Sequence, residues 1–186
     1  CTMALSDSID SAYQDALRLL VPLARREVDI GRLTTYRVGG SSALFIEAET
    51  EKDLKNVAKA RNEIGLPVLV IGKGSNLLVA DSGFPGITVV LGKQFYATTI
   101  NKDTAIVHAG SSVALPSLAR RCVSARLSGF EWAVGVPGSI GGAVRMNAGG
   151  HGSDMQASLV QVEMFDLTSS ITQIKSKEQM AFGYRE

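Results

Sequence analysis

The sequence predicts an α+β fold, and three observations lead to this expectation. Helix-like and strand-like segments alternate early in the chain. Several adjacent strand-like segments are joined by turns too short for the crossover helix that usually connects a parallel pair of strands. The composition, with 45% hydrophobic and 20% charged residues, is that of an ordinary globular protein. An α+β architecture is therefore favoured over a doubly wound parallel sheet.

Helices are predicted where apolar residues recur at helical spacing between recognisable ends. In the first helix, Ser6 or Asp7 can cap the amino end. The second begins at Thr50, because Asp53 three residues later completes a capping pattern, and Gly65 is placed to end it. The helices are expected at about residues 6–23, 51–64 and 113–127.

Strands are predicted where short apolar segments lie between turn residues. The clearest is the segment PVLVI, which leads directly into a glycine-containing loop at residues 72–76. A turn with Gly83, Pro85 and Gly86 separates two later segments. Strands or extended segments are expected at about residues 43–48, 67–71, 77–80, 87–91, 97–100, 105–109, 160–165 and 171–175.

Charge and hydropathy exclude several classes of function. The chain has 19 Lys and Arg and 18 Asp and Glu, a net charge of +1, which offers no field to attract nucleic acid or an anionic membrane. No apolar run reaches the ~18 residues of a membrane-spanning helix, and the amino end lacks a signal-peptide pattern. We expect a cytoplasmic protein with no nucleic-acid partner and no membrane insertion.

The two cysteines, Cys1 and Cys122, are too few for a disulfide framework. Cys122 falls in the third predicted helix and is expected to be a small buried apolar residue, which fits a reducing cytoplasm. The two histidines, His108 and His151, have no Cys or carboxylate partner at ligand spacing. No metal site is therefore expected.

The first candidate binding loop reads Gly72-Lys73-Gly74-Ser75-Asn76. Successive backbone N–H groups in such a loop form a nest for an anion, most often a phosphate. The loop is neither a P-loop nor a Rossmann turn, because its glycine spacing differs from both. Taken alone, it is also explained as a plain turn, with Lys73 a solvated charge.

A second, glycine-rich segment at residues 135–152 reads GVPGSIGGAVRMNAGGHG. Glycine loses much backbone entropy on folding, so a dense cluster indicates positive φ angles or close approach of another group. The segment keeps apolar residues between its glycines, unlike a flexible linker. Residues 138–143 offer small side chains and free N–H groups at a helix start, where a phosphate is favoured. Close packing of a helix on a sheet is the alternative explanation.

Two such loops in one small domain indicate a ligand with a pyrophosphate and two ends. Four motifs then carry a resemblance: TTYRVGG at 34–40, VIGKGSNLLVA at 70–80, FEWAVGVPGSIGGAVRMNAGGHG at 130–152 and FGYR at 182–185. In this order they resemble the UDP-N-acetylenolpyruvoylglucosamine reductase family, within the vanillyl-alcohol-oxidase-like, PCMH-type FAD fold. The match covers about residues 33–185.

The resemblance implies a PCMH-type FAD-binding domain of two small α+β subdomains over residues 31–186, after a helical extension at residues 1–30. The family's substrate domain, with its general acid, would lie beyond residue 186. FAD would be held non-covalently. Tyr36 and Arg37 would lie near the flavin, and a surface position is the alternative for Arg37.

The resemblance also assigns residues to FAD. The two loops would hold the pyrophosphate, whereas Met146 and Asn147 would lie by the flavin or its ribityl chain. Core packing is the alternative for Met146. The expected cofactor-binding residues are Gly72, Lys73, Gly74, Ser75, Asn76, Leu77, Gly138, Ser139, Gly141, Gly142, Ala143, Met146 and Asn147.

Arg185 is the expected catalytic residue, because members of the family carry a Tyr-Arg pair here and this Arg contacts the enolpyruvyl group of the substrate. The implied reaction is the NADPH-dependent reduction of UDP-N-acetylglucosamine enolpyruvate to UDP-N-acetylmuramate, for peptidoglycan synthesis. Hydride addition to the enolpyruvyl β-carbon places negative charge on the neighbouring carbon and carboxylate. A fixed guanidinium stabilises that charge better than a mobile ammonium.

The chain departs from the family pattern at two places. It has Gly150-His151 where many members have Ala-Tyr, and Glu186 where the family continues with Asp-Ser. Two alternatives stay open beside the reductase. One is another PCMH-type FAD oxidoreductase, such as a sugar or 2-hydroxy acid oxidase. The other is a non-catalytic FAD- or nucleotide-binding module.

Overall fold

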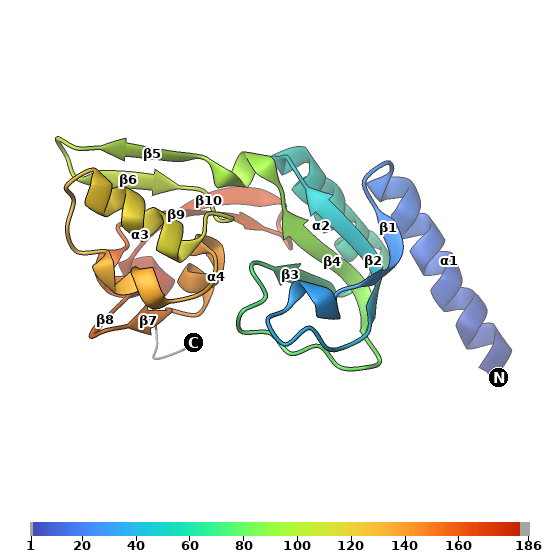
Figure 1. Ribbon diagram of the computed structural model, residues 1–186. Coiled ribbons are helices and arrows are strands. Elements are labelled where there is room, and N and C mark those ends of the chain that lie inside the picture. The colour runs from blue at the N-terminus through green and yellow to red at the C-terminus, as the bar shows by residue number, and fades with distance from the viewer. Residues whose placement is uncertain (1, 183–186) are drawn as a thin grey trace. The chain divides into compact units, whose positions relative to one another are not determined.

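The computed structural model describes residues 2–182 of the chain, with side chains described from Asp10 onward. These residues form two compact units, each built from helices and strands (Figure 1). The first unit contains the described residues up to Ile71, together with Leu77–Val90 and Phe165–Ile171. The second contains Gly72–Asn76, Leu91–Met164 and the described residues from Thr172 onward. The predicted α+β class is confirmed.

A four-stranded sheet forms the framework of the first unit. Its strands are β1 (Arg25–Asp29), β2 (Ser41–Ala48), β3 (Val68–Ile71) and β4 (Phe84–Leu91). They lie in the order β1-β2-β4-β3. Strand β1 pairs antiparallel with β2, and β3 pairs parallel with β4, so the sheet is mixed.

The parallel β3–β4 pair differs from the antiparallel pairing that short connections indicate. The two strands are joined by residues 72–83, which contain no helix. This segment is long enough to carry the chain back, because a parallel connection needs about a dozen residues and only usually a helix. The first glycine loop therefore lies at the carboxyl end of β3, at the start of this crossover.

Helix α2 (Glu51–Ile64) has the ends that its sequence predicts. The Thr50 hydroxyl accepts a hydrogen bond from the Asp53 N–H at 3.3 Å, and the Asp53 carboxylate accepts one from the Thr50 N–H at 2.8 Å. These two bonds complete a capping box. Gly65 adopts the left-handed conformation at the carboxyl end, with φ 82°.

Helix α1 (Thr2–Leu20) begins earlier than the sequence predicts. The predicted start of the helix at Ser6 or Asp7 is therefore wrong, because both residues lie inside it. The helix packs against α2 and β2, and its Leu20 is buried. Residues 2–29 thus lie within the first unit, and a domain boundary at residue 30 stays a prediction.

A pair of buried hydroxyl groups joins two strands of the first sheet. The Thr88 hydroxyl donates to the Ser42 hydroxyl at 2.7 Å, and Ser42 donates to the Leu44 carbonyl at 2.7 Å. Both side chains are fully buried. Each hydroxyl therefore has a partner in an interior where an unpaired polar group is destabilising.

The second unit combines short helices with two-stranded sheets. Strands β5 (Thr98–Asn101) and β6 (Ile106–Ala109) pair antiparallel, as do β7 (Gly149–Gly150) and β8 (Ser153–Asp154). The remaining elements are α3 (Leu115–Ser124), α4 (Ile140–Arg145), α5 (Met155–Ser158), β9 (Gln161–Asp166) and β10 (Ile171–Ser176), with β9 paired to β10. The end of β9, the start of β10 and the turn between them are the segment Phe165–Ile171 of the first unit. The short 3-10 helices of the second unit are η2 (Lys93–Tyr96), η3 (Glu131–Gly135) and η4 (Glu178–Met180), whereas η1 (Gly31–Leu33) belongs to the first unit.

Two predicted segments differ from the observed elements in extent. Helix α3 is shorter than the predicted 113–127, because Pro116 lies in its first turn and marks the start of the helix. The segment 77–80 belongs to no strand. The other predicted helices and strands are found at nearly their expected positions.

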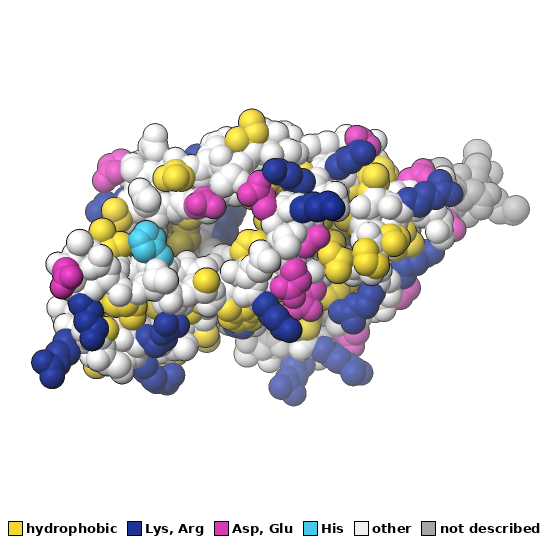
Figure 2. Space-filling model, turned by 90° about the horizontal axis from the view of Figure 1, so that it is seen from above, with side chains coloured by type: hydrophobic (Ala, Val, Ile, Leu, Met, Phe, Trp, Pro, Cys, Tyr) yellow, Lys and Arg dark blue, Asp and Glu magenta, His cyan; other side chains and the backbone are white. Residues whose placement is uncertain are grey.

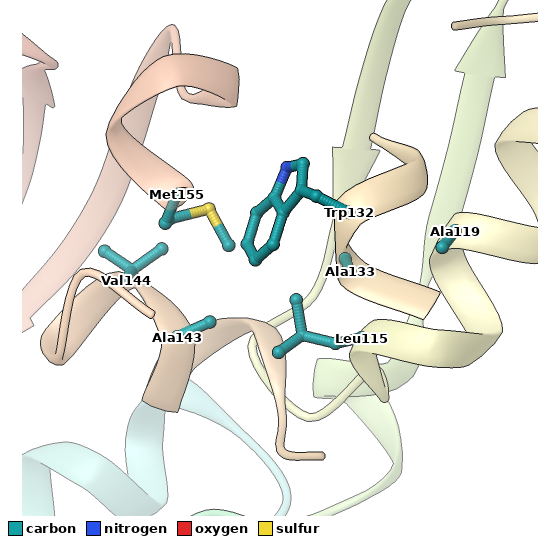
Figure 3. Packing of buried hydrophobic residues seen from close by; sticks show 7 residues of the cluster. All are labelled: Leu115, Ala119, Trp132, Ala133, Ala143, Val144 and Met155. Carbon is teal, nitrogen blue, oxygen red and sulfur yellow. The ribbon is translucent and has the colours of Figure 1, made fainter. Parts of the chain in front are cut away.

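Trp132 lies in the larger core of the second unit (Figure 3). Its indole ring packs with Met155 and Leu115, and the Phe130 ring meets it edge-on with centroids 5.3 Å apart. The indole N–H donates to the Ser158 hydroxyl at 3.0 Å, so the polar atom of this buried ring has a partner. Helix α4 contributes two further residues to this core, which holds the helix in place.

Charge is unevenly divided between the two units. The second unit has ten Lys and Arg against six Asp and Glu in its sequence, and the first has nine against twelve. On the face drawn in Figure 2, basic and acidic side chains are interspersed. No described helix is both long and apolar enough to cross a membrane. The excess of positive charge thus belongs to the unit that contains both glycine loops.

Candidate functional site

The first glycine loop presents a series of unpaired backbone donors. The N–H groups of Lys73, Gly74, Ser75 and Asn76 make no hydrogen bond to any described residue. Gly74 has a φ of 63°, a conformation that glycine adopts without steric penalty. Consecutive free N–H groups around such a residue form an anion-binding concavity.

The second glycine loop begins a helix, as its sequence predicts. Ser139 is the N-cap of α4, and its hydroxyl accepts from the Gly142 N–H at 3.3 Å. However, the N–H groups of Ile140 and Gly141 donate to the Val113 and Ser111 carbonyls at 2.9 and 2.8 Å. They pair the loop with the chain before α3 and are not free for a ligand. Of the predicted donors at 138–142, only those of Gly138 and Ser139 are without a described partner.

The two glycine loops contact each other within the second unit. A Cβ atom at Gly72 would lie 2.4 Å from the Ser139 Oγ, so only a glycine fits there without displacing that hydroxyl. The Ser75 hydroxyl donates to the Pro137 carbonyl at 3.3 Å. Gly138, with φ 134°, follows that carbonyl. The free donors of both loops are therefore carried by two segments in direct contact.

This arrangement fits the pyrophosphate of a dinucleotide. Pyrophosphate oxygens take hydrogen bonds from backbone N–H groups such as those left free in the two loops. Gly72 and Gly142 instead leave room for the Ser139 hydroxyl, because a Cβ at these positions would lie 2.4 and 3.4 Å from its Oγ. Gly141 has a different role, because a Cβ there would come within 2.9 Å of the Ser111 side chain. Its small size allows α4 to pack against the chain before α3.

Lys73 brings a cation to the first loop, and its partner is a residue that no sequence motif indicates. The Lys73 ammonium donates to the Tyr96 hydroxyl at 2.8 Å. Tyr96 ends η2, 23 residues further along the chain, and only folding shows the contact.

Asn147 has a structural role in addition to any that a cofactor would give it. Its side-chain oxygen accepts from the Gln156 N–H at 3.0 Å, and its amide nitrogen donates to the Asp154 carboxylate at 3.4 Å. It is buried and has a φ of 40°. These bonds join the chain before β7 to β8 and to α5, and a place for Asn147 beside the flavin stays a prediction. Met146 is half-buried at the end of α4, and its place beside the flavin also stays a prediction.

Two of the predicted cofactor residues lie in hydrophobic cores. Leu77 packs in the core of the first unit with Ile71 and Val79. Ala143, a residue of α4, is buried in the core of the second unit. Both support the segments that carry the loops, and neither offers a polar group to a ligand.

The other candidates from the sequence are less constrained. Tyr36 and Arg37 belong to the first unit, where Tyr36 is exposed and the Arg37 N–H donates to the Thr34 hydroxyl at 3.1 Å. His151 is exposed at the β7–β8 turn, with its imidazole beside Gly135. Arg185 lies outside the described residues, so its predicted catalytic role stays a prediction.

Cys122 is buried in α3, as the sequence predicts. Burial raises the pKa of its thiol, against a smaller lowering effect of Arg121. Such a thiol is a poor nucleophile at neutral pH. Among the described residues, no group of His, Cys, Asp and Glu is arranged to hold a metal ion.

Comparison with protein families gives one match over most of the chain. The sequence model of the family described as FAD binding domain matches residues 42–175. Among curated proteins, the UDP-N-acetylenolpyruvoylglucosamine reductase of Synechococcus sp. (strain WH7803) is 39% identical over 164 residues. That of Clostridioides difficile (strain 630) is 40% identical over 152 residues. These alignments cover 87% and 82% of this chain but 52% and 49% of the relatives, so the chain spans about half their length.

Solved structures agree with this comparison. UDP-N-acetylenolpyruvylglucosamine reductase from Thermus caldophilus superposes with a TM-score of 0.74 at 33% identity, over 88% of this chain and 56% of that one. p-Cresol methylhydroxylase superposes with a TM-score of 0.56 at 15% identity, over 97% of this chain and 39% of that one. The second likeness shows a shared fold, which is the predicted PCMH-type FAD fold.

Proposed function

This chain belongs to the FAD binding domain family, and on that premise we propose that the complete protein is an NADPH-dependent reductase of UDP-N-acetylglucosamine enolpyruvate. The chain supplies the part that holds FAD. The sugar nucleotide, NADPH and the product UDP-N-acetylmuramate are its small-molecule partners, and it acts in the cytoplasm in peptidoglycan synthesis. The observation that carries the proposal is the contact between two loops with free backbone donors, in a chain whose relatives are named as this reductase.

In this proposal the two loops bind the pyrophosphate from two sides. The N–H groups of Lys73–Asn76 bind its oxygens on one side, and those of Gly138 and Ser139 bind on the other. The Lys73 ammonium adds a positive charge beside the first loop. Helix α4 fixes the second loop, because its core residues and the Ser139 cap hold its start in one place.

The redox chemistry comes from FAD, which when bound supplies the hydride transfer between NADPH and the enolpyruvyl group. Arg185 binds the enolpyruvyl carboxylate and stabilises the negative charge that develops next to it. Its guanidinium stays protonated throughout, so it acts by charge and orientation and not as a proton donor. The proton for the neighbouring carbon comes from another part of the complete protein.

The proposal is tested with the complete protein in two steps. The purified protein should carry flavin that is released on denaturation, or take up FAD when it is added to the apoprotein. It should then oxidise NADPH only when the enolpyruvyl sugar nucleotide is present. A protein that takes up no FAD would overturn the cofactor assignment. A flavoprotein that oxidises a sugar or a 2-hydroxy acid instead would overturn the reductase assignment.

The role of Arg185 is tested by Arg185→Lys in the complete protein. We expect flavin reoxidation by the enolpyruvyl substrate to slow by about tenfold or more, because a lysine cannot hold a carboxylate with two parallel N–H donors. Flavin reduction by NADPH should stay unchanged in the same rapid-mixing measurement. Arg126→Lys, at an exposed position two residues after α3, is the matched control. Equal loss in both half-reactions would contradict the role.

A further inference from the structure

Tyr96 makes a contact that neither the sequence motifs nor the proposed function explains. Its hydroxyl accepts a hydrogen bond from the Lys73 ammonium at 2.8 Å, and that ammonium lies 4.8 Å from the centre of the Tyr96 ring. Lys73 is the one cation within the loop 72–76. The tyrosine side chain is 47% exposed, so its hydroxyl is not needed to fill the core.

Tyr96 is itself held by the chain that supports the second glycine loop. The carbonyl of Phe95, its neighbour, accepts from the Ser112 N–H at 3.0 Å. The Ser111 carbonyl, one residue earlier, accepts from the Gly141 N–H at 2.8 Å. One short segment before α3 therefore carries both η2 and the second loop. A side chain that extends from η2 to Lys73 connects the first loop to the same support.

We propose that Tyr96 is a positioning residue of the dinucleotide site, which holds the Lys73 ammonium beside the free N–H groups of the first loop. This inference rests on the proposed function, since it needs a pyrophosphate at the two loops. A lysine side chain has four rotatable bonds and loses rotational freedom when it binds a phosphate. Because the Tyr96 hydroxyl already restrains it, Lys73 binds the ligand with less loss of entropy. Two ammonium donors remain for phosphate oxygens.

Tyr96 thus acts through Lys73 and not by touching the cofactor. Removing its hydroxyl should therefore weaken FAD binding but leave the flavin spectrum unchanged. The contact is half-exposed and involves one charged group, so we expect a three- to tenfold increase in the FAD dissociation constant, roughly the value of one such hydrogen bond. The effect should diminish at high salt, which screens the interaction of Lys73 with phosphate.

The experiment is a double-mutant cycle on the complete apoprotein. FAD is titrated into wild type, Tyr96→Phe, Lys73→Met and the double variant, and binding is followed by flavin fluorescence at low and high salt. Tyr96→Phe keeps the ring and removes only the hydroxyl. We expect the double variant to bind FAD no more weakly than Lys73→Met alone, because the tyrosine acts through the lysine. Controls are Tyr13→Phe and Lys59→Met, at positions on α1 and α2 whose side chains make no hydrogen bond with any described residue.

Two results would overturn the inference. One is a Tyr96→Phe variant that binds FAD as tightly as wild type. The other is an equal loss of FAD affinity from Tyr96→Phe in wild type and in the Lys73→Met background. Such a result would mean that the tyrosine acts directly on FAD or through the fold. An unchanged thermal unfolding midpoint for Tyr96→Phe excludes a folding defect. If the wild-type protein takes up no FAD, the proposed function itself fails, and with it the inference about Tyr96.

Discussion

Gly72→Ala is expected to damage the start of α4 through a single atom. A Cβ at residue 72 would lie 2.4 Å from the Ser139 Oγ but 3.6 Å from the Ser139 Cβ. Only the hydroxyl is therefore in the way, because 3.6 Å is an ordinary carbon contact. Ser139 is 2% exposed, and its hydroxyl caps α4 by accepting from the Gly142 N–H at 3.3 Å. The new methyl group forces this hydroxyl out of its capping position.

The expected cost follows from what the displaced hydroxyl does. Loss of a serine N-cap destabilises by ~0.5–2 kcal/mol. A buried hydroxyl left without a partner adds ~1–3 kcal/mol if the side chain finds no new acceptor. We expect Gly72→Ala to lower the free energy of unfolding by about 0.5–2 kcal/mol if the hydroxyl finds a new acceptor and by about 1.5–5 kcal/mol if it does not. FAD binding should weaken as well, because the clash displaces Ser139, one of the two residues of the second loop with a free N–H group.

The assay is urea unfolding of the 186-residue chain for wild type, Gly72→Ala, Ser139→Ala and the double variant. Ser139→Ala alone should cost about 1 kcal/mol, the value of the cap. In the Ser139→Ala background, Gly72→Ala should cost less than about 0.5 kcal/mol, because the clashing atom is absent. An equal cost of Gly72→Ala in both backgrounds would refute the clash with the hydroxyl as the cause.

Two further predictions concern buried groups. Ser42→Ala leaves the Thr88 hydroxyl buried without its acceptor, so urea unfolding should show a free energy of unfolding lower by about 1–3 kcal/mol. The control Ser124→Ala, at an exposed position, should lower it by less than about 0.5 kcal/mol. Equal losses for the two variants would contradict the reasoning. Burial raises the pKa of the Cys122 thiol, so the unfolded chain loses this proton first as pH rises. The contribution of Cys122 to the free energy of unfolding should be fully present below the ordinary thiol pKa and should decline as pH rises above it. A Cys122→Ala chain with the same alkaline decline in urea midpoint would contradict this.

Much of the fold is predictable because its signals are local. Thr50 and Asp53 stand three residues apart and complete their own capping box, and Gly65 ends the same helix without help from the rest of the chain. The strand before the first glycine loop is a continuous apolar run. In such segments, neighbouring residues supply most of the interactions that decide the conformation.

Other features needed partners far away in the sequence. The parallel pairing of β3 with β4 depends on how residues 72–83 return the chain, and hydrophobic patterning does not record this path. The capping of α1 was misplaced because the helix continues into residues that precede the predicted cap. Element ends of this kind depend on weak local preferences that neighbouring turns override.

The sequence was sufficient to locate the two glycine loops and their chemistry, because glycine spacing and small residues report directly on backbone shape. It was not sufficient to show which N–H groups are free. Those of Ile140 and Gly141 bond to the chain before α3, whereas those of Lys73–Asn76 have no described partner. The sequence could not show the contact of Tyr96 either. Its hydrogen bond with Lys73 depends on distance in space and leaves no pattern along the chain.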